Sequence, residues 1–171
     1  MQIRNMLPGI CVGLLATAGM AASASVAPAD RQFLETAAHY DMSEANQAEL
    51  AENQATRSDV KDLAKMMEQD HKDSYWHLSE LASKTGVAIP KGIDSAKDPT
   101  ISSLHHLKGN RFDSQFARDQ IAVDQREIAL FKREADHGQD PDVKAYAAKM
   151  VPVLEKHLHL AQECTKPGPH S

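Results

Sequence analysis

The sequence predicts an all-α fold, a four-helix bundle made of two helical hairpins with a long connection between helices two and three. Three observations point to this class. Glycine and proline are scarce between residues 29 and 85, where Ala, Leu, Met, Glu, Lys and Gln dominate, as they do in helices. Apolar residues recur at spacings of three and four along four long segments. Short joints within each pair of segments make the two helices of that pair antiparallel.

The first hairpin is expected to comprise a helix over about residues 30–55 and a second helix that begins at Ser58. Asp30 and Ser58 are the expected N-caps, because their side chains can accept hydrogen bonds from the free N–H groups of a first turn. Gly86 should end the second helix, since glycine readily adopts the left-handed conformation found there. The inward stripe of the first helix is mostly alanine, so a neighbouring helix can approach it closely.

The connection between the hairpins is expected to be a loop over residues 86–99, where glycine and proline return. A short helix around residues 101–107 follows, and Gly109 should end it. This is the one long joint in the predicted bundle, so it must carry the chain from the first hairpin to the second.

The second hairpin is expected to comprise a helix over about residues 112–137 and a last helix that ends near Cys164. Asp140 and Pro141 mark the start of the last helix, because an N-cap followed by proline at the first helical position is a typical helix beginning. Pro152 should interrupt and bend the last helix, since proline lacks the N–H that the helical ladder needs.

Residues 1–24 are predicted to be a signal peptide that is removed on export. Arg4 gives a thin positive start, residues 10–18 form a short apolar run, and Ala22-Ser23-Ala24 offers a cleavage site. The apolar run is too short to span a bilayer, and no later segment approaches that length. We therefore expect a single mature domain over residues 25–171, with a core of about 30–164, in the periplasm or secreted.

The charge and the cysteine content of the sequence limit the kinds of molecule that the protein is expected to bind. The chain has 19 basic and 24 acidic residues, a net charge of −5, and the signs are interspersed. No basic patch invites nucleic acid or an anionic lipid surface. Cys164 is the only cysteine outside the leader, so no disulfide can form within the mature chain. Cys164 is a bystander, the contact of a disulfide-linked homodimer, or a reactive thiol, and protein partners are otherwise open.

One strong ligand side chain lies in the apolar stripe of each long helix: Glu44, His71, Asp124 and His157. Glu44 is 13 residues before the first turn and His71 is 14 after it, so both lie roughly 20 Å along the first hairpin. In the second hairpin Asp124 and His157 lie at roughly 22 and 27 Å, about one helical turn apart. A single cluster in the middle of the bundle is feasible.

Two interpretations of this cluster stay open. Burying an ionised carboxylate without a partner is very costly, so the four groups need either a cation or mutual hydrogen bonds. A divalent transition metal such as iron, zinc, copper or manganese would use both the carboxylates and neutral imidazoles. Auxiliary ligands would be Glu68, Asp70 and Glu127, with Asp70 orienting an imidazole. Otherwise the cluster is a structural network that fixes helix register.

The chain resembles a family of exported bacterial proteins known as domain of unknown function 4142, which is grouped with ferritin-like folds and often labelled a predicted outer membrane protein. The resemblance covers about residues 30–164. It rests on stretches such as "FLETAAHYDMSEANQAELA" and "VKDLAKMMEQDHKDSYWHLSELASKTGVAIP", and on a third that starts "FDSQFARDQIAVDQREIALFKREADHGQDP". The features that recur in the family pattern are Glu44, Asp70-His71, Gly86-Val-x-x-Pro90, Pro152 and His157. This chain has Asp124 where the third helix of the family usually carries a histidine.

The resemblance implies a ferritin-like four-helix bundle in the cell envelope but no reaction. The functions that we expect are therefore metal sequestration or envelope stress protection by a metal-binding bundle, or an interaction module whose inward cluster is purely structural. Association with the outer membrane rests on the family label alone. No catalytic residue is assigned, and a two-metal oxidoreductase with Glu68 as an extra ligand is the interpretation that the sequence favours least, because only one Glu-x-x-His spacing is present.

Overall fold

The computed structural model describes residues 26–166, which are entirely helical apart from turns and one long connection. The predicted signal peptide lies outside the described residues. Within them there are five α-helices and one 3₁₀ turn: α1 (Pro28–Gln54), α2 (Ser58–Thr85), η1 (Ser95–Lys97), α3 (Pro99–His105), α4 (Gly109–His137) and α5 (Pro141–Cys164). The all-helical prediction is confirmed. The short helix expected in the connection is α3, so a count of four helices describes only the long ones.

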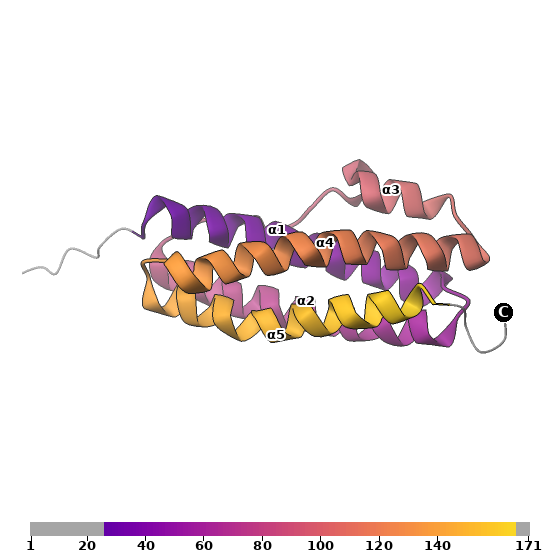
Figure 1. Ribbon diagram of the computed structural model, residues 1–171. Coiled ribbons are helices and arrows are strands. Elements are labelled where there is room, and N and C mark those ends of the chain that lie inside the picture. The colour runs from indigo at the N-terminus through magenta and orange to yellow at the C-terminus, as the bar shows by residue number, and fades with distance from the viewer. Residues whose placement is uncertain (1–25, 167–171) are drawn as a thin grey trace, which may run out of the picture.

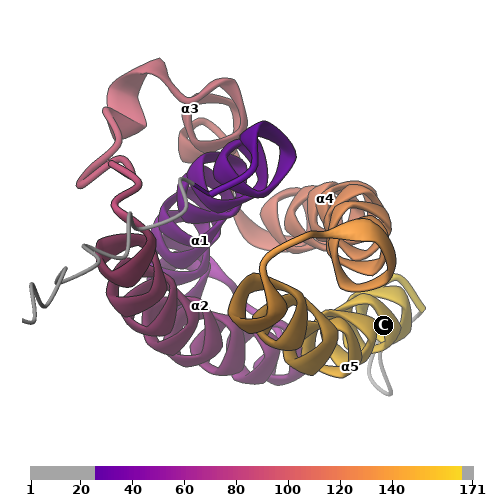
Figure 2. The ribbon, with the colours of Figure 1, turned by 90° about the vertical axis from the view of Figure 1, so that its left-hand side faces the viewer.

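The four long helices lie side by side, with α3 outside them (Figure 1). Viewed along the helices, α1 is flanked by α2 and α4, and α5 lies between α2 and α4 (Figure 2). The closest pairs are α1 with α2 and α4 with α5, which are the two predicted hairpins. No helix in residues 26–166 is both long enough and apolar enough to cross a membrane.

Several helix ends differ from the sequence prediction. The first helix begins at Pro28, and Asp30 does not cap it, because its buried carboxylate is used elsewhere in the fold. Gly109 was expected to end the short helix, but it begins α4, with a φ of 56°. Ser58 is the first residue of α2 and the preceding position has no side-chain cap. Propensity places helices well, but their ends depend on tertiary contacts.

Other helix ends agree with the prediction. Gly86 ends α2 in the left-handed conformation, with a φ of 69°. The Asp140 carboxylate accepts hydrogen bonds from the backbone N–H groups of Asp142 and Val143, as expected of an N-cap. In contrast to the predicted interruption, α5 continues as one helix on both sides of Pro152.

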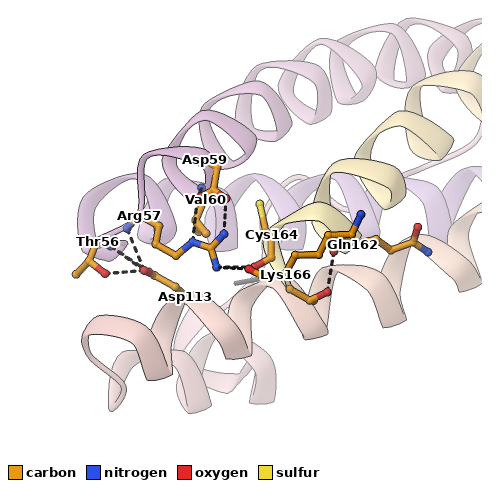
Figure 3. A network of polar contacts seen from close by, with 9 residues as sticks. Thr56, Arg57, Asp59, Val60, Asp113, Gln162, Cys164 and Lys166 are labelled. Atoms are coloured by element: carbon orange, nitrogen blue, oxygen red, sulfur yellow. Dashed lines mark hydrogen bonds and ion pairs between the residues drawn. The ribbon is translucent and has the colours of Figure 1, made fainter. Parts of the chain in front are cut away.

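Each hairpin turn is held by a buried aspartate from the other hairpin. The Asp113 carboxylate of α4 accepts hydrogen bonds from the backbone N–H groups of Thr56 and Arg57, each at 3.0 Å, in the α1–α2 turn (Figure 3). At the opposite end, the Asp30 carboxylate accepts from the backbone N–H of Gln139 at 3.0 Å and of Asp140 at 2.7 Å. These reciprocal caps fix the two hairpins relative to each other.

The end of the chain is fastened beside the same turn. Arg57 donates from Nη1 to the carbonyl oxygen of Cys164 at 2.9 Å (Figure 3). The Cys164 side chain is 4% exposed, and burial raises the pKa of its thiol to about 11. The described fold therefore places this cysteine in the core, where a thiolate is disfavoured.

A polar layer divides the core into two apolar clusters. One cluster fills the end near the α4–α5 turn, with Phe33, Leu78 and Phe131 among its members. The other fills the end near the α1–α2 turn and includes Met67 and Phe116. Apart from Asp30, Asp113 and Glu134 near the helix ends, the buried charged and polar residues of the long helices fall between these two stretches. Burial of the two apolar clusters stabilises the fold. The polar layer between them adds little apolar burial, so its residues are available for another role.

Replacing the reciprocal cap at Asp113 tests how much it contributes. We expect Asp113→Ala to lower the free energy of unfolding by about 1–3 kcal/mol, because the N–H groups of Thr56 and Arg57 would lose their buried acceptor. Urea unfolding followed by circular dichroism measures this. Asp136→Ala, at an exposed position of the same helix, is the matched control. Equal midpoints for the two variants would contradict the capping role.

Candidate metal centre

Five ionisable side chains from three helices meet in the polar layer. Asp41 and Glu44 come from α1, His71 from α2, and Asp124 and Glu127 from α4. Asp41 is 1% exposed and the other four are fully buried. The pairs on α1 and α4 each have a spacing of three residues, which places both carboxylates of a pair on one face of the helix. The layer therefore concentrates four carboxyl groups around one imidazole.

His71 lies between the two carboxyl groups of α1. Its Nδ1 is 3.1 Å from Asp41 Oδ1, and its Nε2 is 3.2 Å from Glu44 Oε2. The second oxygen of Asp41 accepts a hydrogen bond from Ser74 Oγ at 2.9 Å, and Ser74 Oγ lies 2.7 Å from the Tyr146 hydroxyl. This chain fixes the orientation of the imidazole and leaves Nε2 facing Glu44 without a well-aligned hydrogen bond.

Three of the carboxyl groups lack hydrogen-bond donors. Both oxygens of Glu44, of Asp124 and of Glu127 are buried and accept no hydrogen bond. Buried polar atoms in proteins are nearly always hydrogen-bonded, and leaving one unpaired costs about 1–3 kcal/mol. Six such oxygens in one layer call for a missing partner. Carboxylate oxygens and an imidazole nitrogen are the donors that a divalent cation binds, so these residues fit a metal ion.

The protonation of the cluster reflects this crowding. Burial, with Glu44 adding to it, raises the pKa of Asp124 from 3.8 to about 8. Burial likewise holds the pKa of Glu127 well above its usual value. Burial alone would lower the pKa of His71, but the neighbouring carboxylates of Glu44 and Asp41 outweigh it and raise the pKa well above 6.5. Without a metal the layer therefore balances its charge by holding protons.

The ligand atoms fall into two overlapping groups. In the first, which we call the His71 trio, one atom each from Asp41, His71 and Glu127 lie within 4.8 Å of one another. In the second, the Asp124 trio, the same holds for Glu44, Asp124 and Glu127. Glu127 belongs to both. Within residues 26–166, no other set of acidic, histidine or cysteine side chains reaches this proximity.

The four residues that the sequence singled out are all fully buried, but only three of them enter these groups. His157 lies beside the cluster, with its ring centroid 5.3 Å from that of His71, and belongs to neither trio. Its Nε2 is 2.9 Å from Asp70 Oδ2, and its Nδ1 has no partner. Burial and the neighbouring His71 lower its pKa, which favours a neutral imidazole.

The three residues predicted as auxiliary ligands lie at different distances from the cluster. Glu127 is central, because both trios contain it. Asp70 is 34% exposed and contacts His157, so it lies between the surface and the cluster. Glu68 pairs with Lys72 on the surface of α2 and is away from both trios. Asp41 is a member of the cluster that the apolar stripes do not indicate, although Asp41-x-x-Glu44 and Asp124-x-x-Glu127 repeat one spacing that could have revealed it.

A cleft of about 330 Å³ reaches the cluster from the surface between α1 and α2. Asp41 and His71 lie among its lining residues, and Lys91, Gly92 and Ile93 of the long connection line its outer side. The connection is pinned beside the cleft by the Tyr75 hydroxyl, which donates to the Pro90 carbonyl at 2.7 Å. Of the five residues in the cluster, Asp41 and His71 are the two that line this cleft.

Comparison with protein families assigns the chain. The family described as "Domain of unknown function (DUF4142)" matches residues 15–164. The chain belongs to this family. A comparison with curated protein sequences finds no match. The resemblance noted in the sequence is therefore confirmed for this DUF4142 protein, and the family itself brings no established activity.

Solved structures of similar fold are distant in sequence. A DUF305 fragment from Deinococcus radiodurans matches with a TM-score of 0.72 and 16% identity, over 82% of this DUF4142 chain and 97% of the other. CopM in its Cu(II)-bound form matches with a TM-score of 0.68 and 15% identity, over 80% and 95% of the two chains. CopM in its Ag-bound form matches with a TM-score of 0.65 and 16% identity, over 78% and 93%. At these identities the likeness establishes the fold alone.

Neutralising Asp124 in this DUF4142 protein should stabilise the metal-free form. Between pH 3.8 and about 8 the folded state retains a proton that the unfolded state releases, so stability falls as the pH rises through that window. Asp124→Asn removes this loss. We expect its advantage in unfolding free energy over the parent protein to grow with pH and to reach at least about 1 kcal/mol.

Urea unfolding at several pH values between 3.8 and about 8, with a chelator present, measures this advantage. The exposed substitution Asp136→Asn is the control and should leave the pH dependence unchanged. A constant or shrinking difference between Asp124→Asn and the parent would show that Asp124 is ionised in the folded state.

Proposed function

We propose that this protein binds a divalent transition metal ion in the buried cluster of Asp41, Glu44, His71, Asp124 and Glu127. The observation that carries the proposal is the set of six buried carboxylate oxygens without donors, on Glu44, Asp124 and Glu127, directed at the same layer as His71. A cation would neutralise these carboxylates and accept their lone pairs, which removes the cost of burying them. Asp41 would orient His71 through Nδ1 or bind the ion itself.

The donor set favours particular metals. Oxygen ligands predominate and one imidazole is present, a combination suited to Fe²⁺, Mn²⁺ or Zn²⁺. Neither trio contains a cysteine, and the buried Met67 and Met150 pack in the apolar clusters. Cu⁺ and Ag⁺ prefer sulfur ligands. CopM binds copper and silver, but the chemistry of this cluster supports a harder ion here.

Within this proposal the protein is an exported, ferritin-like bundle that sequesters metal or protects the envelope by holding it. No reaction is assigned to it. Binding would release protons from His71, Asp124 and Glu127, because a ligand must be deprotonated to bind, and the affinity should therefore rise with pH.

A structural role is the second candidate. The hydrogen-bonded chain from His71 through Asp41 and Ser74 to Tyr146 is complete without any ion, as a network that fixes helix register would be. In such a network a proton on Glu127 lets this carboxyl donate to Glu44. The structural role still leaves both oxygens of Asp124 without a partner. The two candidates differ in one observable, the metal content of the protein.

The decisive comparison uses two buried glutamates of α4. Glu127 belongs to both trios, whereas Glu134 is two helical turns further along, is buried beside Asp30 and belongs to neither. We expect Glu127→Gln to abolish stoichiometric metal binding and Glu134→Gln to leave it unchanged. The measurement is metal analysis by mass spectrometry after equilibrium dialysis of the untagged protein against Fe²⁺, Mn²⁺ and Zn²⁺ in turn.

Both variants exchange a carboxyl group for an amide of nearly the same shape, so a packing defect should affect them alike. Circular dichroism checks that each is helical. Metal bound equally by both variants would place the ion elsewhere. No metal bound by the parent protein under any of these conditions would favour the structural role.

Export can be tested separately from metal binding. The proposal requires cleavage after Ala24 and delivery to the periplasm or the medium. We expect fractionation of expressing cells to recover the protein outside the cytoplasm. Its intact mass should equal that of a chain whose first residue is Ser25. Replacing Ala22 and Ala24 by bulky residues should retain the full-length precursor, because signal peptidase needs small residues at those positions. A full-length chain recovered from the cytoplasm of the parent strain would contradict export.

A further inference from the structure

The two hairpins repeat one another in sequence at a fixed offset of 83 residues. Without a gap, residues 30–81 and 113–164 share eleven identical positions. The shared residues include Gln32/Gln115, Lys61/Lys144 and Glu80/Glu163, and also a set that is buried in both hairpins: Asp30/Asp113, Phe33/Phe116, Asp41/Asp124, Glu44/Glu127, Val60/Val143, Ala64/Ala147 and Met67/Met150. The identities thus concentrate where the two hairpins meet.

The hydrogen bonds follow the same offset. Asp30 accepts from the backbone of Gln139 and Asp140, and Asp113 accepts from Thr56 and Arg57. Subtracting 83 from Asp113 gives Asp30, and adding 83 to Thr56 and Arg57 gives Gln139 and Asp140. The offset therefore converts one contact into the other with the two hairpins exchanged. Such an exchange is what a two-fold axis between the hairpins produces. The offset therefore describes the three-dimensional structure as well as the sequence.

The polar layer obeys the same exchange. The His71 trio takes its aspartate, Asp41, from α1 and its glutamate, Glu127, from α4. The Asp124 trio takes its aspartate from α4 and its glutamate, Glu44, from α1. Asp41 corresponds to Asp124 and Glu44 to Glu127 under the offset of 83. The two trios are therefore two copies of one half-site on either side of the axis.

The copies differ at one ligand position. The counterpart of His71 is Leu154, which is fully buried on α5. The first half-site has an imidazole, and the second has an apolar side chain in the corresponding place. Its third carboxylate is instead Glu127, which both trios contain.

We infer that the cluster is a pair of unequal half-sites that share Glu127, with one position for a transition metal at the His71 trio and a second position for a harder cation at the Asp124 trio. This inference rests on the proposed function and specifies the number and chemical class of its ions. Imidazole favours Zn²⁺ or Fe²⁺ at the first position, and an all-carboxylate set favours Mn²⁺ or Mg²⁺ at the second. The asymmetry is set by His71 and Leu154.

The first test is a titration of the parent protein. Dialysis against Zn²⁺ alone should give one tightly bound ion, and addition of Mn²⁺ to the zinc-loaded protein should give one manganese ion without displacing zinc. Metal analysis by mass spectrometry counts both. Manganese that binds only by displacing zinc would show a single position and overturn the inference, although metal binding itself would stand. Failure of the parent protein to bind either ion would overturn both proposals.

The second test exchanges the two residues that set the asymmetry. His71→Leu makes the first half-site a copy of the second, so zinc affinity should fall at least about 100-fold, since losing a direct ligand costs more than losing an outer partner. His77→Leu, an exposed position of the same helix, is the matched control and should bind zinc normally. Equal zinc affinities for these two variants would overturn the assignment of His71.

Leu154→His makes the second half-site a copy of the first and should add a second tight zinc ion. Combined with His71→Leu, it should restore one tight zinc ion at the opposite half-site. Circular dichroism establishes which variants fold, and the parent titration decides the question if the Leu154 variants do not. A folded Leu154→His protein that still binds only one zinc ion tightly would overturn the inference.

Discussion

Four carboxyl groups and one imidazole share a buried layer, and the need to balance their charge constrains the rest of the structure. Carboxylates so close together and out of water cannot all ionise without a cation. The raised pKa values of Asp124 and Glu127 are the response of the metal-free protein. The layer therefore reduces stability in the absence of a ligand, and the two apolar clusters on either side of it must compensate.

Bringing these groups to one level requires the helices to keep their register over their whole length. The buried aspartates at the two ends do this, because Asp30 and Asp113 each bind the turn of the opposite hairpin. Slippage of one hairpin along the other would leave backbone N–H groups of a turn unpaired at each end. The caps at the two ends thus fix the register of the helices in the polar layer. The position of Glu127, which both trios contain, therefore depends on contacts far from it.

Much of this fold was predictable, because the apolar stripes are long and regular. The same stripes correctly placed Glu44, His71 and Asp124 in the interior. Asp30 was misjudged because its carboxylate binds a turn 109 residues away, which no local pattern reveals. Counting residues from the second turn predicts that His157 lies about one helical turn above Asp124, whereas in the structure it lies beside His71 and is hydrogen-bonded to Asp70. Asp41 was missed because taking one ligand per helix ignored the repeated Asp-x-x-Glu spacing.

The reciprocal caps have a consequence for how such a chain can be assembled. One hairpin carries both the aspartate near the start of its first helix and the turn that an equivalent aspartate would bind. Two copies of a single hairpin could therefore close both contacts as a symmetric dimer, with an Asp-x-x-Glu pair from each copy in the shared interior. Residues 86–108 are then a covalent tether that joins the two hairpins in one chain. That tether allows them to diverge, so that one helix carries His71 and its counterpart carries Leu154.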